Sequence, residues 1–482
     1  MVPPLSMLAR PFRGGDTLRL WLQLLLLSLL ACAPSPLEQA DQRFKEGRYD
    51  QAAALYQAAD AQSSNDPQLR RRLALSLAWS ERPSEAEPLL LALSQQANDP
   101  EIAAALTDVT AVLRGGPEAE ALALKSLEQF PDASVVVRAG ATLTAQRGEL
   151  DEARRLLEHA LNLDPKNVAA LANLGDLQLK QQDYPGAIVR YQEAVALQPL
   201  SPLSVRLRVR MAQVIAESSP YQSLTLLEEA VSIMPEHPEA NAELGKVQAL
   251  LGDCDRGMAA LKRAAEKLPQ RGDVISTLGY CYLQQAGRDG QRSSLVAAQT
   301  WFERLIKQSP RWKGAHTNLG LVLLRLDDPE GAEAAFRQEL TLYPSSVEAM
   351  SNLGRLLADH GKADEASAML ERAFSLDKRQ VLLPMELGAL AMSASDYAKA
   401  LTWYQAAYLL CQNSPFDHPC RQEVPYQLAR LLVRQREVDA AVRLFKEALQ
   451  AGFRDIARFK AEPELKVLAS DSEVAAFLNG TR

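Results

Sequence analysis

A unit of 34 residues recurs along this chain and limits the folds that it can adopt. Its clearest copy, Val168 to Ser201, reads as two amphipathic helices joined by a short turn. Gly175 and Ala187 are small where the two helices must pack closely, and Tyr191 is large enough to fill the gap between neighbouring pairs. Prolines that end the second helix recur every 34 residues, at Pro131, Pro165 and Pro199. Such a chain is predicted to be all-α, with each helix pair burying the faces of its neighbours.

These positions are those of the tetratricopeptide repeat, which the chain resembles over about 420 residues. A Leu-Gly pair in the first helix recurs at Leu174-Gly175, Leu244-Gly245, Leu278-Gly279, Leu319-Gly320, Leu353-Gly354 and Leu387-Gly388. The resemblance implies a right-handed superhelical solenoid of about twelve helix–turn–helix hairpins. It also implies that the first helices of the hairpins line a concave groove, where a peptide or a helix of a protein partner binds.

The spacing of the repeats also predicts how the chain is divided. We assign residues 37–200 and 201–451 to N-terminal and C-terminal repeats, and residues 452–482 to a helical cap over the last hairpin. Seven extra residues in one hairpin are expected to form a polar loop at 287–294, and a second insertion lies at 413–419.

The first 31 residues are predicted to be a secretory signal peptide. Arg10, Arg13 and Arg19 precede the apolar run Leu20 to Leu30, which ends in small Ala31. The run is shorter than the roughly 20 apolar residues that a membrane-spanning helix needs.

The end of that run, Leu29-Leu30-Ala31-Cys32, resembles the lipobox of bacterial lipoproteins. The resemblance implies that Cys32 is acylated and becomes the first mature residue, with 32–36 as the lipidated cysteine and its tether. Ala33 follows the cysteine, which in the sorting rule of that family implies the outer membrane, facing the periplasm. The alternative is ordinary signal cleavage beside an incidental cysteine.

Polar side chains of the first helices are the candidate binding residues. Asparagine precedes Leu-Gly in three repeats, where similar arrays use the amide to bond an extended peptide backbone. Basic side chains nearby are the second kind of candidate, although they do not form the full carboxylate-binding pattern of chaperone-binding relatives. The candidates are Asn173, Lys180, Lys246, Asn318, Arg325, Asn352 and Arg355. The alternative is that these asparagines are ordinary solvated residues.

Four cysteines remain once Cys32 is set aside, an even number for a chain outside the cytosol. We predict a disulfide between Cys411 and Cys420, which flank the second insertion. For Cys254 and Cys281, the sequence is compatible both with a disulfide and with two buried thiols that are not bonded to each other. A zinc cluster of Cys411, Asp417, His418 and Cys420 is disfavoured, because the spacing matches no usual zinc site. No metal or cofactor is predicted.

The chain carries no recognisable catalytic, phosphate-binding or dinucleotide motif, and the repeats leave no room for an appended catalytic domain. A net charge of −7 with mixed signs argues against nucleic acid as a partner. The sequence therefore predicts a non-catalytic, lipid-anchored adaptor in a bacterial envelope complex, such as pilus, secretion, polysaccharide-export or motility machinery. The alternatives are an unanchored secreted interaction protein and a regulator of a cell-wall or polysaccharide enzyme.

Overall fold

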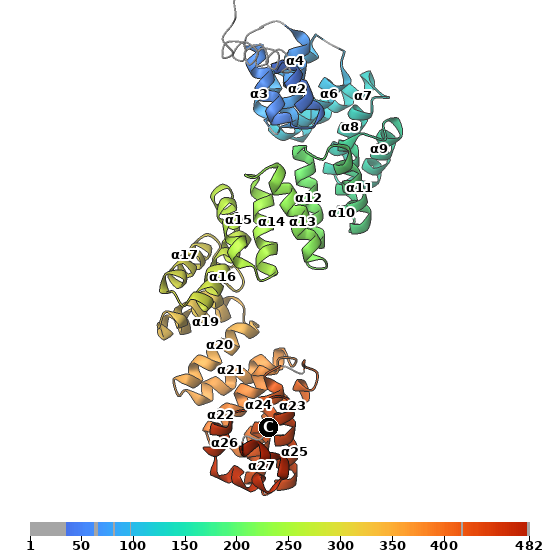
Figure 1. The fold of residues 1–482 in the computed structure, drawn as a ribbon. Helices are drawn as coiled ribbons and strands as arrows, with labels where there is room; N and C mark the ends of the chain where they lie inside the picture. Colours follow the sequence, from blue (N-terminus) through green and yellow to red (C-terminus); the bar gives the residue numbers. More distant parts are fainter. Residues whose placement is uncertain (1–34, 62–65, 81, 97, 416–417, 480–482) are drawn as a thin grey trace, which may run out of the picture. The chain divides into compact units, whose positions relative to one another are not determined.

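A computed structural model describes residues 35–61, 66–80, 82–96, 98–415 and 418–479 of the chain. In these residues the regular structure is entirely helical, and successive helices pair as antiparallel hairpins (Figure 1). The all-α prediction is therefore confirmed. The predicted signal peptide and Cys32 lie outside the described residues. No helix within the described ranges is long and apolar enough to cross a membrane.

The chain divides into two compact units between Leu251 and Gly252. The division drawn from the repeats, at 200/201, lies inside the first of these units. In a stack of similar hairpins each one contacts its neighbours on both sides, so the repeat pattern carries little information about where a compact unit ends.

The first unit consists of six hairpins followed by one first helix, counted over its described residues. Its helices are α2 (Pro36–Lys45), α3 (Tyr49–Asp60), α4 (Pro67–Trp79), α5 (Pro83–Ser94), α6 (Pro100–Leu113), α7 (Gly116–Gln129), α8 (Ser134–Gln146), α9 (Leu150–Leu163), α10 (Val168–Lys180), α11 (Tyr184–Leu197), α12 (Pro202–Ile215), α13 (Pro220–Ile233) and α14 (Pro238–Leu250).

The second unit begins with a second helix, continues with five hairpins and ends in three short helices. These are α15 (Cys254–Lys267), α16 (Gly272–Asp289), α17 (Arg292–Gln308), α18 (Ala315–Arg325), α19 (Pro329–Leu342), α20 (Val347–Asp359), α21 (Ala363–Leu376), α22 (Leu382–Ser393), α23 (Tyr397–Cys411), α24 (Cys420–Arg434), α25 (Val438–Gln450), α26 (Ile456–Lys460), the 3₁₀ helix η1 (Pro463–Ser470) and α27 (Ser472–Leu478).

The hairpins close because a glycine in the first helix meets a large side chain of the second. A Cβ atom added to Gly175 would lie 2.6 Å from the ring of Tyr191, and one added to Gly320 would lie 2.5 Å from the ring of Phe336. Both rings are completely buried. Contacts this short leave no space for a side chain, so glycine permits the two helices to approach. The predicted close crossing at Gly175 is confirmed.

The predicted polar loop at 287–294 is wrong. Helix α16 continues to Asp289 and α17 begins at Arg292, which leaves only Gly290 and Gln291 between them. Gly290 ends α16 in the left-handed conformation, at φ 64°. Seven extra residues correspond to about two helical turns. Shared between two antiparallel helices, they lengthen both by about one turn each and keep their backbone hydrogen bonds.

Residues after α25 form the predicted cap. Phe459, Leu465 and Phe477 come from α26, η1 and α27 respectively, and pack with Phe445 of α25 in one buried cluster. The ring of Phe445 lies 4.9 Å from that of Phe459, centroid to centroid. The cap thus covers an apolar surface that in other hairpins is covered by the next repeat.

Candidate binding face

The sequence-predicted binding residues all lie on first helices, but in both compact units. Asn173 and Lys180 belong to α10 and Lys246 to α14, in the first unit. The other four lie in the second unit, Asn318 and Arg325 on α18, and Asn352 and Arg355 on α20. We call the surface of the first helices the first-helix face, and describe it in each unit separately.

In the first unit the candidate side chains are largely engaged within the array. The Asn173 amide donates a hydrogen bond of 2.7 Å to Oγ1 of Thr142, on the preceding first helix α8. Lys246 Nζ lies 2.9 Å from Oε2 of Glu243, one turn away on α14. Lys180 is exposed. Of these three, Lys180 is therefore the side chain most available to a partner.

Ion pairs connect consecutive first helices in this unit. Arg72 on α4 pairs with Asp41 on α2, and Arg210 on α12 pairs with Asp176 on α10. Arg138 on α8 makes the same kind of contact with Asp108 on α6, at 2.6 Å. Each pair joins two hairpins along the first-helix face, so these charges contribute to stacking as well as to the polarity of the surface.

Two of these ion pairs extend into the core through a tyrosine. The hydroxyl of Tyr56 donates to Asp41 at 2.5 Å, and that of Tyr191 donates to Asp176 at 2.6 Å. Burial, followed by the adjacent carboxylate, raises the pKa of both tyrosines above its ordinary value. The same Tyr–Asp–Arg contact therefore links the second helix, its own first helix and the next hairpin at two places. Sequence reasoning missed it, although in both hairpins the tyrosine follows the aspartate by 15 residues.

In the second unit the asparagines are also partly occupied. Asn352 is 8% exposed, and its Oδ1 accepts a hydrogen bond from Arg355. Arg355 Nε lies 3.6 Å from Oε1 of Glu386 on the next first helix, α22. Arg325 donates to the carbonyl oxygen of Leu283 at 3.2 Å, whereas Asn318 is half-buried. A peptide backbone would have to share or displace the contacts of Asn173 and Asn352.

Glu386 is the most strongly perturbed acid on this face. Its side chain is 22% exposed, and Oε2 is buried without a hydrogen-bond partner. Burial raises its pKa to about 7, against the opposing effect of Arg355. Between pH 4.5 and 7 the folded state therefore holds a proton that the unfolded state has released, so stability falls as the pH rises through this window.

We expect this proton to be measurable in the unfolding equilibrium. Between about pH 4.5 and pH 8 the wild type should lose on the order of 2–3 kcal/mol of unfolding free energy relative to the Glu386→Gln variant. Urea unfolding followed by circular dichroism at each pH measures the difference, and the variant cancels the contributions of other titrating groups. Parallel pH profiles for the two proteins would show that folding does not raise the pKa of Glu386.

The four cysteines of the described part are joined in two disulfides. Cys254 of α15 is bonded to Cys281 of α16, with their Cα atoms 5.2 Å apart, and Cys411 is bonded to Cys420 across the loop between α23 and α24, at 6.0 Å. All four side chains are buried. Asp417 of the disfavoured zinc cluster lies outside the described residues. Within those residues no group of three or more His, Cys, Asp or Glu side chains is arranged to hold a metal ion.

Two family profiles described as tetratricopeptide repeat match the chain. One matches residues 43–109 and 145–210, the other residues 291–347 and 351–418, and together they cover more than half of the chain. The chain therefore belongs to the tetratricopeptide-repeat family. Proteins of this family mediate protein–protein interaction and are generally non-catalytic.

Individual relatives are distant. The chain is 24% identical to the protein CTR9 homolog of Arabidopsis thaliana, over 68% of its own length and 27% of that protein. It is 27% identical to cellulose synthase operon protein C of Xanthomonas axonopodis, over 63% of its length and 20% of that protein. A solved tetratricopeptide repeat protein from Parabacteroides merdae is 13% identical, covers 58% of this chain and 98% of its own, and has a TM-score of 0.42. The chain thus spans about a quarter of the length of these two curated relatives.

Proposed function

We propose that this chain is a lipid-anchored adaptor of a bacterial envelope complex, facing the periplasm from the outer membrane. The observation that carries the interaction role is the stack of hairpins, whose first helices present polar and charged side chains over many repeats. Such a surface suits an extended segment or a helix of another protein. The anchor is assigned to Cys32, and the tether to the residues that lead into α2.

Two further features support a location in the bacterial cell envelope. Disulfides persist mainly in proteins outside the cytosol, and both cysteine pairs of the repeats are bonded. One relative is named for a cellulose synthase operon, which fits polysaccharide export among the envelope machines considered. The match covers a fifth of that protein, so the proposal also includes pilus, secretion and motility complexes as partners.

The anchor is tested by replacing Cys32 with alanine. We expect the wild type to sediment with membranes and to require detergent for release, whereas the Cys32→Ala variant is recovered in the soluble envelope fraction, because acylation of one cysteine supplies the membrane affinity. Ser35→Ala, which leaves the cysteine intact, is the matched control. Equal membrane association of the Cys32→Ala variant would contradict the anchor and favour another means of retention, while release of the wild type without detergent would favour the secreted alternative.

The adaptor role is tested separately, by affinity purification of the wild type from detergent-solubilised envelopes and mass spectrometry of the bound proteins. Recovery of structural components of a pilus, secretin, motility or polysaccharide-export machine supports the proposal. Recovery of a cell-wall or polysaccharide enzyme alone would favour the regulatory alternative.

A further inference from the structure

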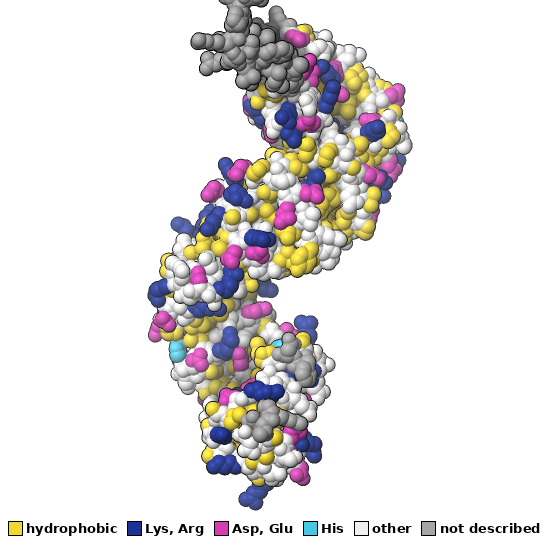
Figure 2. All heavy atoms as spheres, in the orientation of Figure 1, with side chains coloured by type: hydrophobic (Ala, Val, Ile, Leu, Met, Phe, Trp, Pro, Cys, Tyr) yellow, Lys and Arg dark blue, Asp and Glu magenta, His cyan; other side chains and the backbone are white. Residues whose placement is uncertain are grey.

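Positive charge is concentrated in one part of this acidic chain. Residues 254–313, which comprise α15, α16, α17 and the loop that follows, contain eleven Lys and Arg against five Asp and Glu. The segment thus has a net charge of +6 in a chain whose net charge is −7. Figure 2 shows Lys and Arg side chains gathered over the region of α15 and α17.

Four of these cations are exposed at one end of the hairpins. Lys267 ends α15, Lys307 lies in the last turn of α17, and Arg311 and Lys313 follow in the loop before α18. We call these four residues the cationic edge. Within the described ranges, the structure places no carboxylate within ion-pairing distance of any of the four side chains.

Some other cations of the same segment are neutralised by carboxylates, unlike those of the cationic edge. At the opposite end of α16, Arg288 lies 2.9 Å from Asp255 of α15. Arg271, close to the cationic edge in the loop before α16, pairs with Asp273. The four side chains of the cationic edge are therefore among the cations of the segment that no ion pair within the described residues neutralises.

Packing holds the two loops of the cationic edge together. The ring of Trp312, between Arg311 and Lys313 in the sequence, lies against Gly272 so closely that a Cβ atom there would be 2.5 Å from it. Arg304 of α17 donates a hydrogen bond of 3.0 Å to the carbonyl oxygen of Pro269, in the loop after α15. The cations are thus carried by a packed surface, which lowers the entropy cost of binding a ligand to it.

We propose that the cationic edge binds an acidic segment of a protein partner, separately from the first-helix face. Carboxylates of such a segment complement the lysine and arginine side chains and form charge-assisted hydrogen bonds with them. The cationic edge is confined to the ends of two successive hairpins, which suits a short segment. This proposal does not depend on the lipid anchor.

Long polyanions fit the surface less well. A long polyanion extends beyond the cationic edge and meets the net negative charge of the rest of the chain, whereas a short acidic segment can stay on the edge. Three aromatic rings of the region are engaged within the protein: Lys262 lies over Tyr282 at 5.3 Å, Arg304 over Trp301 at 5.1 Å, and Trp312 covers Gly272. Each of these rings therefore already has a contact within the protein, which reduces the surface available for stacking on the bases of single-stranded nucleic acid.

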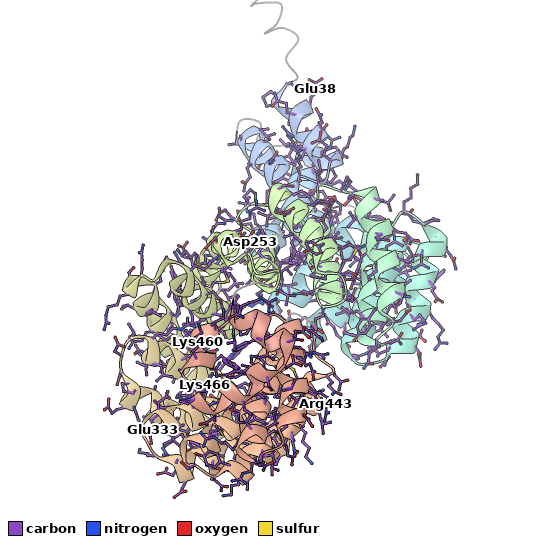
Figure 3. The ribbon with its side chains drawn as sticks, turned by 60° about the horizontal axis from the view of Figure 1, so that its bottom comes forward. Glu38, Asp253, Glu333, Arg443, Lys460 and Lys466 are labelled. Carbon is purple, nitrogen blue, oxygen red and sulfur yellow. A yellow bond between two sulfur atoms is a disulfide. The ribbon has the colours of Figure 1, made fainter. Side chains whose placement is uncertain are left out.

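The test is the affinity of the full-length protein for a fluorescently labelled oligoglutamate peptide, measured by anisotropy. Two triple variants lose the same charge from exposed cations. The edge variant is Lys307→Gln, Arg311→Gln and Lys313→Gln. The control variant is Arg443→Gln, Lys460→Gln and Lys466→Gln, in α25 and the cap (Figure 3). We expect the edge variant to bind at least about tenfold more weakly and the control to stay within about twofold of the wild type.

Salt and competing ligands complete the test. Raising the salt concentration from about 50 to about 300 mM should weaken binding by the wild type more than binding by the edge variant. Equal affinities of the two triple variants would overturn the proposal. So would tighter, edge-dependent binding of anionic phospholipid vesicles or single-stranded DNA than of the peptide. If the edge variant loses helicity, the single changes Lys313→Glu and Lys466→Glu replace the two triples, with the same expected contrast.

Discussion

Replacing Gly354 with leucine should lower the free energy of unfolding by about 3 kcal/mol or more. Gly354 lies on α20, where a Cβ atom would be 2.7 Å from Cγ of Leu370 on α21. Leu370 is buried and belongs to the core that this hairpin shares with the next one. A leucine at 354 must therefore push the two helices apart, which disturbs the contacts of both hairpins. Urea unfolding followed by circular dichroism measures the loss.

Gly287 supplies the matched control for this experiment. It also lies within a first helix, α16, but the nearest atom to an added Cβ is Nη1 of Arg325, at 3.7 Å. Because glycine is a poor helix former, Gly287→Leu should leave stability unchanged or raise it by about 0.5–1 kcal/mol. Equal losses for the two variants would show that close helix crossing is not what requires glycine at 354.

Loss of the Cys254–Cys281 disulfide should cost the folded protein about 3–4 kcal/mol. The two cysteines are 27 residues apart and join α15 to α16, which belong to successive hairpins. The bond therefore restricts a long loop in the unfolded chain, and the longer the closed loop, the larger the entropy that it removes. The Cys254→Ala, Cys281→Ala variant keeps small apolar side chains at both buried positions and removes the bond together with its two sulfur atoms.

The second disulfide provides the comparison. Cys411 and Cys420 are 9 residues apart, so their double alanine variant should lose about 2–3 kcal/mol, less than the first. The urea midpoints of the two variants, with and without a thiol reductant, measure both effects. A reductant should lower the midpoint of each variant only through the disulfide that remains. A larger loss for the Cys411 and Cys420 pair would contradict the loop-length argument.

Much of the fold follows from local sequence. Residues similar in size to Gly175, Ala187 and Tyr191 recur at fixed spacing in other repeats. The sizes of these side chains indicate where two helices can pack closely. The apolar clusters after residue 452 likewise predicted the cap. The loop predicted at 287–294 is wrong because polar residues and glycines favour a loop locally, whereas antiparallel packing of α16 against α17 extends both helices.

The binding face was less predictable. A repeated amide on the first helices can bond a peptide backbone, and the positions of Asn173 and Asn352 on those helices follow from the repeat. Their actual partners, Thr142 and Arg355, depend on the rotation of one helix against the next and on side-chain choices that no repeat pattern contains.

The repeat, the helix pairing and the class of protein follow from the amino-acid sequence alone, because these depend on spacing and side-chain size within about 34 residues. Which distant groups meet depends instead on the tertiary structure. Asp176 contacts Arg210 and Tyr191, and Arg355 pairs with Glu386. The loops before α16 and after α17 pack together through Trp312. Each contact joins residues on different helices, many of them in different hairpins, and the stacking that buries the apolar faces is what brings them within reach of one another.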